Sequence, residues 1–476
     1  MKTLHKFGFA LFLVIAGLLG HCPVLYAQSD LKGFSQDDAR GLYFKWKNDS
    51  IEKWSFHYQL TTIAQAHPAF NATYSGKNSL HDSAESALSL TTTFFLGRKL
   101  WKGAAVYCDP EISGGKGMSY ALGLAGAANG ETYRIGDPAP TLYIGRIYYQ
   151  QIFAIDGSKK TSLQDAEKNQ LGDRIPDSRI TITAGKFSLA DYFDDNDFSH
   201  DPRTQFINWS LMSNGAWDYP ANTRGYTSGF VVELINPTWA ARVSAVLEPR
   251  IANAEVMDMN ISKAHGETAE VERNFKIHGR EGTVRLLGFV NNSSAINYKT
   301  SISQLQHGDS VNWLSAVAVA SGHIAGANYN SGLKYGFGLS YDQVLTDNLG
   351  FFCRASWNDG QSSTWAFTEI DQSASAGLVC KAKKIKRPLD NFGLAIVVNG
   401  ISQAHRDFLN AGGYGFILGD GKLTNYGLEQ ILETYYSCRL EKSLYLTFDY
   451  QFVINPGYNM DRGPVNVFAG RIHVEF

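Results

Sequence analysis

Beyond residue 27 the sequence contains no apolar run long enough to cross a bilayer as a helix, which takes about 20 residues. Its formal net charge is only −2, so it lacks the basic stripe that a nucleic-acid partner requires. The signatures HExxH, GxSxG and GxGxxG are absent, and residues 117–121 lack the second glycine of GxSxG. We therefore expect no helical membrane protein, no nucleic-acid partner and no enzyme. The one enzymatic alternative is a barrel lipase, whose Ser–His pair needs no local motif.

Cysteine is scarce and scattered. Four cysteines follow residue 27, at positions 108, 353, 380 and 438, and none belongs to a CxxC pair or to zinc-like spacing. Alternation places the last three on the apolar face of their segments, where cysteine behaves as a small hydrophobic residue. We expect no disulfide framework, no metal site and no cofactor.

The N-terminus carries an export signal. Lys2 and Lys6 precede an apolar run from Phe7 to Gly20, and Ala27 offers a small residue at the cleavage point. Residues 1–27 are therefore interpreted as a signal peptide, and residues 28–50 as a short lead-in. A lipoprotein anchor at Cys22 is rejected because His21 stands where a small residue is needed. The rest of the chain, residues 51–476, has to fold as an exported domain.

Alternation with a period of two residues dominates this domain. At the C-terminus Phe468, Ile472 and Phe476 share one phase, while Arg471 and His473 share the other. A strand that is apolar on one face and polar on the other suits a membrane barrel, which meets lipid outside and water inside. About sixteen segments have this pattern and a length near the 9–11 residues of a tilted membrane strand. They lie near residues 54–64, 88–96, 102–109, 142–152, 180–186, 226–235, 238–247, 283–290, 311–319, 333–341, 350–357, 374–382, 391–399, 430–439, 443–453 and 466–476.

Short and long connections alternate along the chain, as the periplasmic turns and extracellular loops of such barrels do. The pattern predicts a long loop over 248–282 and needs an extra strand between 291 and 332, for which 311–319 is the candidate. Residues 153–179 break the rule, because they fall on the short side yet are long and polar. The predicted fold class is all-β: a transmembrane antiparallel β-barrel of about sixteen strands with long extracellular loops.

Several motifs in this domain resemble the carbohydrate-selective porins of the OprB type. They are Pro68-Ala69-Phe70, residues 74–80, Gly123–Gly126, Gly185–Ser188, Asn358-Asp359-Gly360, residues 367–371, residues 411–416, Gly419-Asp420-Gly421, residues 433–436, residues 455–459 and residues 461–465. The resemblance implies an outer-membrane porin that lets small neutral sugars diffuse passively, with outer-membrane lipids around it. It also leaves a homotrimer open, since trimers are common among porins. The alternatives are a general porin for small polar solutes and the barrel lipase; an energy-coupled transporter is rejected because residues 28–50 are too short for a plug.

Selectivity in such a channel needs an inward-folded loop with polar side chains. The best candidate is the loop over residues 187–225, which contains Asp191, Asp194, Asp195, Arg203, Trp209 and Trp217. Carboxylates can hydrogen-bond sugar hydroxyls, and aromatic rings can stack on a pyranose. Two alternatives remain for this acidic run: a solvated surface loop, or a calcium loop starting at Asp195, against which His200 stands in place of the tight-turn glycine.

The phase of the strands sends further charged residues into the lumen. These are Arg354, Lys381, Arg439, Arg471, His473 and Glu475. For any one of them, hydrating the lumen and pairing with a neighbour is the simpler role. Glu111 after the third strand and Arg98 in the turn before it are also expected to approach the channel.

Overall fold

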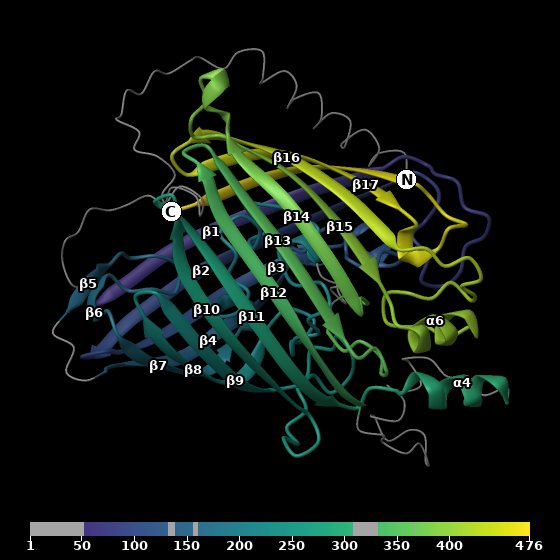
Figure 1. Ribbon diagram of the computed structural model, residues 1–476, viewed down its shortest axis with the longest axis horizontal. Helices are drawn as coiled ribbons and strands as arrows, with labels where there is room; N and C mark the ends of the chain where they lie inside the picture. The colour runs from purple at the N-terminus through teal and green to yellow at the C-terminus, as the bar shows by residue number, and fades with distance from the viewer. Residues whose placement is uncertain (1–51, 132–138, 156–159, 308–331, 367) are drawn as a thin grey trace.

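The computed structural model describes residues 52–131, 139–155, 160–307, 332–366 and 368–476. Within them, sixteen strands close into one barrel (Figure 1). They are β1(Trp54–His67), β2(Glu85–Trp101), β3(Ala104–Gly115), β4(Thr141–Ala154), β7(Arg179–Phe187), β8(Thr227–Asn236), β9(Trp239–Leu247), β10(His265–Ile277), β11(Arg280–Ser293), β12(Gly332–Thr346), β13(Leu349–Asn358), β14(Gln372–Lys381), β15(Asn391–Gly400), β16(Glu429–Glu441), β17(Leu444–Ile454) and β18(Val465–Glu475). The predicted all-β barrel is confirmed.

The first and last strands join to close the cylinder. Strand β1 pairs antiparallel with β18, with Leu60 opposite Val474 and Thr62 opposite Ile472. All remaining pairs join barrel strands that follow one another along the chain. Closure matters because a free strand edge in lipid would leave backbone groups without hydrogen bonds.

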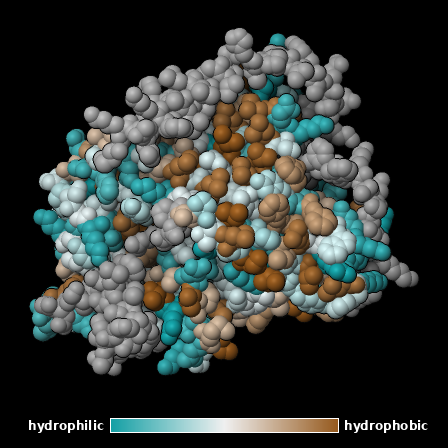
Figure 2. Space-filling view, turned by 180° about the vertical axis from the view of Figure 1, so that it is seen from behind, coloured by the Kyte–Doolittle hydropathy of each residue, from teal (hydrophilic) through white to brown (hydrophobic). Residues whose placement is uncertain are grey.

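The two faces of the wall match the predicted alternation. On β18 the outward residues Phe468 and Ile472 are 51% and 37% exposed, whereas the inward Arg471 and His473 are buried. The outward rows are apolar because they meet lipid. Figure 2 shows these apolar side chains gathered across the middle of the wall, with hydrophilic residues towards both ends.

One strand was missed and one predicted loop is wrong. Residues 248–282 were expected to form a long loop, but β10 occupies 265–277 and pairs with β9 and β11. Its outward row, which contains Glu267, Ala269 and Val271, is too polar to show apolar alternation. The candidate strand over 311–319 lies outside the described residues, and β11 pairs directly with β12.

The exceptional connection between β4 and β7 is long in the structure as well. It contains a two-stranded hairpin, β5(Thr161–Gln164) with β6(Asp173–Pro176), which we call the periplasmic hairpin. It lies at the same end as the short turns. This connection is therefore at the end that the alternation predicts, but it is longer than the other connections there.

The remaining long connections carry short helices. These are η1(Met118–Ala121), η2(Leu189–Asp191), α3(Trp209–Met212), α4(Tyr298–Gln306), α6(Gln403–Asn410) and η4(Pro456–Tyr458), while η3(Ala382–Ile385) lies in a turn at the opposite end. None of the helices in the described ranges is long and apolar enough to cross a membrane. The predicted signal peptide, residues 1–27, and the lead-in, residues 28–50, lie outside the described residues.

Candidate functional site

The segment between β7 and β8, residues 188–226 and hereafter the inward loop, folds into the barrel. Its side chains Phe193 and Phe206 are fully buried, and Trp209 is 2% exposed. They pack against inward-facing wall residues in two apolar clusters. The prediction that this loop folds inward is confirmed, and the alternative of a solvated surface loop is wrong.

A buried ion pair fixes the inward loop to β13. The Nε atom of Arg354 lies 2.9 Å from Oδ1 of Asp194, and its guanidinium also donates to the carbonyl oxygens of Leu211 at 2.8 Å and Ser199 at 2.5 Å. The second carboxylate oxygen of Asp194 accepts from the backbone N–H of Asn214 at 2.6 Å. Two predicted site residues, Arg354 and Asp194, therefore contact each other. Their charges hold the loop in place and are not accessible to a passing solute.

Wall carboxylates hold the loop backbone at further points. Glu433 of β16 accepts from the N–H groups of Ile207 at 2.6 Å and Asn208 at 2.9 Å. Glu270 of β10 accepts from the N–H of Asp194 at 2.8 Å. A buried carboxylate loses its hydration, and these donors replace it. Because β10 and β16 are far apart in the barrel order, the loop is braced across the lumen.

Two more predicted site residues, Arg471 and Trp209, are buried where the inward loop contacts the wall. Arg471 is 1% exposed, and it donates to the carbonyl oxygen of Gln205 at 2.9 Å and to that of Pro202. Its predicted inward direction is confirmed. Trp209 starts helix α3 inside an apolar cluster, so its ring is covered by protein and cannot stack on a sugar in this conformation.

Charged side chains that keep solvent contact lie on another part of the wall. Arg146 of β4 donates twice to Asp191 of the inward loop, from Nε at 2.7 Å and from a terminal nitrogen at 2.6 Å. Its other terminal nitrogen lies 3.4 Å from Asp109. The side chains of Arg146 and Asp191 are 12% and 28% exposed. Arg146 was not predicted, because a register shift at Asp109 and Pro110 changes its phase relative to Leu142.

Glu111 joins the same cluster. Its carboxylate accepts from the hydroxyl groups of Thr93 at 2.6 Å and Tyr226 at 3.0 Å. The guanidinium of Arg146 lies 5.2 Å from the centre of the Tyr226 ring, within the range of a cation–π contact. The structure therefore brings the predicted residues Glu111 and Asp191 together through Arg146 and Tyr226.

A second charged group joins the inward loop to the loop after β3. Arg203 lies 3.1 Å from Glu131 and 3.7 Å from Asp201. Burial raises the pKa of Glu131 to about 7, although Arg203 acts in the opposite direction. Burial also disfavours the charged form of Asp201, but Arg203 and Lys168 outweigh it and lower the pKa of that carboxyl. Asp195, on the same loop, is half-buried.

The periplasmic hairpin lies over the lumen at the end of the barrel that carries the short turns. Lys168 lies 3.3 Å from Glu475 of β18 and 3.2 Å from the side-chain oxygen of Gln59. Asn169 donates to Asp109 at 3.0 Å, and Leu171 packs in the cluster that contains Tyr107. The predicted lumen residue Glu475 thus pairs with a segment that the sequence did not place near it.

Two predicted site residues lie away from the lumen centre. Arg98 is in the outward row of β2 with its guanidinium 4.5 Å from the ring centre of Trp54, so the expectation that it approaches the channel is wrong. Arg439 lies at the end of β16 and donates to the carbonyl oxygen of Lys442 at 2.7 Å. Both belong to the rim that carries the short turns.

Sequence reasoning also missed a belt of ion pairs on the inner wall. Arg242 of β9 lies 3.1 Å from Glu233, 3.2 Å from Glu270 and 3.0 Å from Glu272. Arg285 of β11 lies 3.2 Å from Glu272. Both arginines pair with Glu272 of β10. The sequence did not predict the belt because β10 was expected to be part of a loop.

The calcium interpretation finds no ligand set in the structure. Across the described ranges, no group of three or more His, Cys, Asp or Glu side chains is placed to hold a metal ion. Asp191 and Asp194, which precede the candidate calcium loop in the same acidic run, bind arginines. The acidic run is therefore part of the loop's anchoring.

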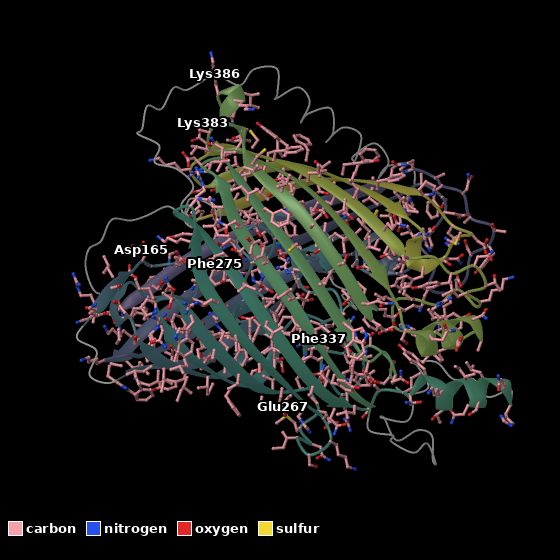
Figure 3. The ribbon with its side chains drawn as sticks, viewed as in Figure 1. Asp165, Glu267, Phe275, Phe337, Lys383 and Lys386 are labelled. Atoms are coloured by element: carbon pink, nitrogen blue, oxygen red, sulfur yellow. The ribbon has the colours of Figure 1, made fainter. Side chains whose placement is uncertain are left out.

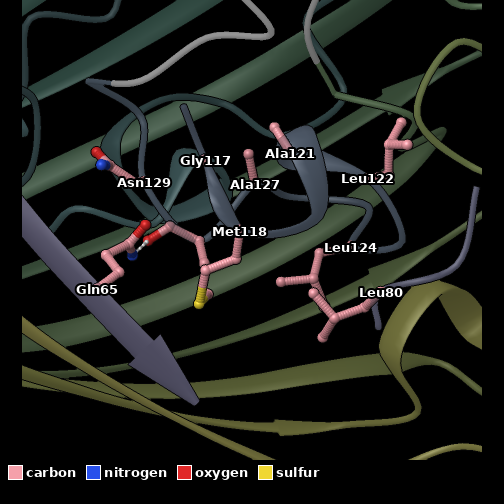
Figure 4. A pocket seen from close by; sticks show the side chains of 10 residues that line it. Gln65, Leu80, Gly117, Met118, Ala121, Leu122, Leu124, Ala127 and Asn129 are labelled. Atoms are coloured by element: carbon pink, nitrogen blue, oxygen red, sulfur yellow. Dashed lines mark hydrogen bonds between the residues drawn. The ribbon is translucent and has the colours of Figure 1, made fainter. Parts of the chain in front are cut away.

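A small cavity lies where the loop after β3 meets β1 (Figure 4). Gln65 reaches across it and donates to the carbonyl oxygen of Ala128 at 3.0 Å. The lining residues are Gln65, Leu80, Gly117, Met118, Ala121, Leu122, Leu124, Ala127, Ala128 and Asn129. Most of them are apolar, so this cavity resembles a packing gap rather than a sugar site.

Comparison with known proteins gives one family. The model of the carbohydrate-selective porin, OprB family, matches residues 86–476. No curated protein matches the chain significantly.

Among solved structures, the high-pH structure of Pseudomonas putida OprB superposes with a TM-score of 0.65 at 16% identity and covers 89% of this chain and 94% of that one. The outer-membrane channel DcaP of Acinetobacter baumannii gives a TM-score of 0.45 at 12% identity, covering 91% of this chain and 99% of that one. At these identities the first likeness concerns the fold alone.

Proposed function

The chain belongs to the OprB family of carbohydrate-selective porins and is an outer-membrane channel for the passive diffusion of sugars, and we propose that solutes pass along the β1–β4 side of its lumen. On the β8–β18 side the inward loop is in buried contact with the wall through Arg354, Glu433 and Arg471. On the β1–β4 side Arg146 and Arg203 keep some solvent contact and lie beside the inward loop. Arg242 of β9 is about as exposed, but three carboxylates of the wall surround it. The position of Arg146 and Arg203 is the observation that carries the proposal.

The chemistry of this side suits neutral, hydroxyl-rich solutes. Each of these mostly buried arginines is paired with a carboxylate, Arg146 with Asp191 and Arg203 with Glu131. Such pairs offer strong donors and acceptors to sugar hydroxyls while their net charge stays near zero. Binding at each pair stays weak because the partners already satisfy one another, and weak binding lets a solute leave.

Aromatic surface is present as well, although not at the predicted tryptophan. The guanidinium of Arg224 lies 3.9 Å from the ring centre of Tyr143, an inward-facing residue of β4. Tyr226 stands next to it and holds Glu111. We propose that Tyr143, which is only half-buried, takes the stacking role assigned to Trp209 from the sequence, whereas Tyr226 is 4% exposed and positions Glu111.

Liposome swelling tests this proposal. Proteoliposomes are diluted into isotonic solutions of neutral monosaccharides and of charged solutes of the same size. Neutral sugars are expected to enter faster. Equal rates would establish the general porin instead, and no swelling with any solute would contradict diffusion through this barrel. An Arg146→Gln variant is expected to slow the neutral sugars, whereas Lys422→Gln, in an extracellular loop, serves as the control.

A further inference from the structure

The turn between β14 and β15, residues 381–390 and hereafter the basic turn, has an unusual charge. It contains Lys381, Lys383, Lys384, Lys386 and Arg387, five cations within seven residues. Figure 3 shows Lys383 and Lys386 on this turn, which projects beyond the barrel wall. It lies with the short turns, at the end that faces the periplasm in outer-membrane barrels.

The charge of the basic turn is not neutralised within the protein. Its one carboxylate, Asp390, is buried and already bound by Arg387 at 2.8 Å, by the Tyr436 hydroxyl at 2.6 Å and by the backbone N–H of Arg439 at 3.1 Å. Lys383, Lys384 and Lys386 are exposed, and in the described ranges no ion pair involves them. Three cations therefore remain to attract an anion.

Two other cations on the same rim are paired with carboxylates. Lys276 lies 3.3 Å from Glu281, and Arg280 lies 3.1 Å from Asp347, both in or beside neighbouring turns. What sets the basic turn apart is that three exposed lysines, with no ion pair among the described residues, stand within four positions. The basic turn is therefore distinct in its chemistry, and Lys276 with Arg280 provides a matched comparison.

Apolar side chains accompany the lysines. Ile385 is 63% exposed and Leu389 is 43% exposed. The two strands that the turn joins carry the lipid-facing residues Leu378 and Phe392, each 40% exposed. Apolar side chains that continue the lipid-facing surface, surrounded by long cationic ones, are the composition of a segment at the boundary of headgroups and acyl chains.

From these observations we infer that the basic turn binds an anionic phospholipid of the periplasmic leaflet, with its phosphate held by Lys383, Lys384 and Lys386 and its acyl region against Ile385. Charge complementarity selects the phosphate, and the lipid-facing Leu378 and Phe392 on the two strands that the turn joins put the turn beside the headgroups. Clusters of lysine and arginine beside a membrane are attracted to anionic lipids in this way. The inference is independent of the solute that the lumen passes.

Native mass spectrometry of the full-length barrel tests the inference. Phosphatidylglycerol and phosphatidylcholine with the same acyl chains are titrated into the protein in detergent. The wild type is expected to bind phosphatidylglycerol more tightly. The double variant Lys383→Gln/Lys386→Gln should weaken that binding on the order of tenfold, since each surface cation contributes several-fold. Lys276→Gln/Arg280→Gln removes the same charge from the same rim and should bind as the wild type does.

Other results would overturn it. Equal affinity for the two lipids, or an unchanged affinity in the Lys383/Lys386 variant, contradicts a phosphate site at the turn. Binding of a soluble acidic peptide without any preference for phosphatidylglycerol would make the turn a protein-docking surface. Ile385→Gln tests the contact with the acyl region separately from the contact with the phosphate, because it should weaken lipid binding but leave the lysines in place. The heat-dependent gel shift of each variant confirms that its barrel is closed.

Discussion

The inward loop and the periplasmic hairpin both cover the lumen, but they are held in different ways. The inward loop is buried along most of its length and fixed by charged groups from several strands, among them Arg354, Glu433 and Arg471. The hairpin is anchored by half-buried polar contacts, among them those of Lys168, Asn169 and Asp173, by hydrogen bonds between Gly172 and Glu52, and by one buried leucine, Leu171. Local opening is easiest where few buried contacts are lost. We therefore expect the loop to act as fixed wall and the hairpin as the movable cover.

Removing the main brace of the loop should have the largest effect. Arg354→Met leaves the carboxylate of Asp194 buried without its cation, and breaking a buried pair from one side costs about 3–5 kcal/mol. We expect a lower unfolding temperature, a higher single-channel conductance and less discrimination between solutes. The double variant Arg354→Met/Asp194→Asn should recover part of the unfolding temperature. Arg439→Met, at the rim, is the control. An Arg354→Met barrel with wild-type melting and conductance would show that the loop is not braced here.

Deleting the hairpin should give a smaller and different change. With residues 160–176 replaced by a short Gly-Ser link, the mouth of the lumen loses its cover but the sixteen-strand wall keeps its pairing. We expect faster swelling with sugars larger than monosaccharides and an unfolding temperature close to the wild-type value. Unchanged swelling would place the narrowest point wholly at the inward loop, whereas a collapse of the barrel would make the hairpin part of the wall's stability.

Lowering the pH should change the charge of the lumen beside the inward loop. Burial raises the pKa of Glu131 to about 7, with Arg203 opposing the shift. Below that pH Glu131 takes a proton and becomes neutral while Arg203 stays charged, so the lumen beside the loop gains positive charge. The reversal potential in a salt gradient should move towards anion selectivity as the pH falls through 7. Glu131→Gln should show the low-pH selectivity throughout, and a variant that keeps the wild-type pH response would locate the titrating group elsewhere.

The wall was predictable from the sequence because its signal is local. Alternation alone placed Ile472 outward and Arg471 inward, since neighbouring residues of a strand point to opposite faces. It failed at β10, where Glu267 and Arg273 interrupt the outward row on either side of Ala269 and Val271, and Phe275 and Ile277 follow only at its end. A strand whose lipid-facing stretch is this short carries little apolar signal.

The site was predictable in outline only. The length and polarity of the inward loop identified it, but the partners of its residues come from distant parts of the chain, as Glu433 does for Ile207. Arg146 was hidden by a register shift, and no local pattern announces such a shift. Residue type therefore suggested which groups were functional, whereas only the closed barrel separates Arg354, which is fully enclosed by the loop, from Arg146, which keeps some solvent contact.

The smallest expected effect concerns the tether of the hairpin. Lys168 lies 3.3 Å from Glu475, and the two side chains are 17% and 5% exposed. This pair is less buried than Arg354–Asp194, and Glu475 keeps His473 at 3.3 Å, so Lys168→Met should lower the unfolding temperature less than Arg354→Met and raise sugar flux only modestly. Salt supplies the decisive comparison, because it screens a partly exposed pair more than a buried one. Wild-type flux should approach that of the variant as salt increases, whereas Arg174→Met, at an exposed position of β6 in the same hairpin, should keep the wild-type salt dependence. A flux difference that persists at high salt would mean that packing of Leu171, and not the ion pair, keeps the hairpin closed.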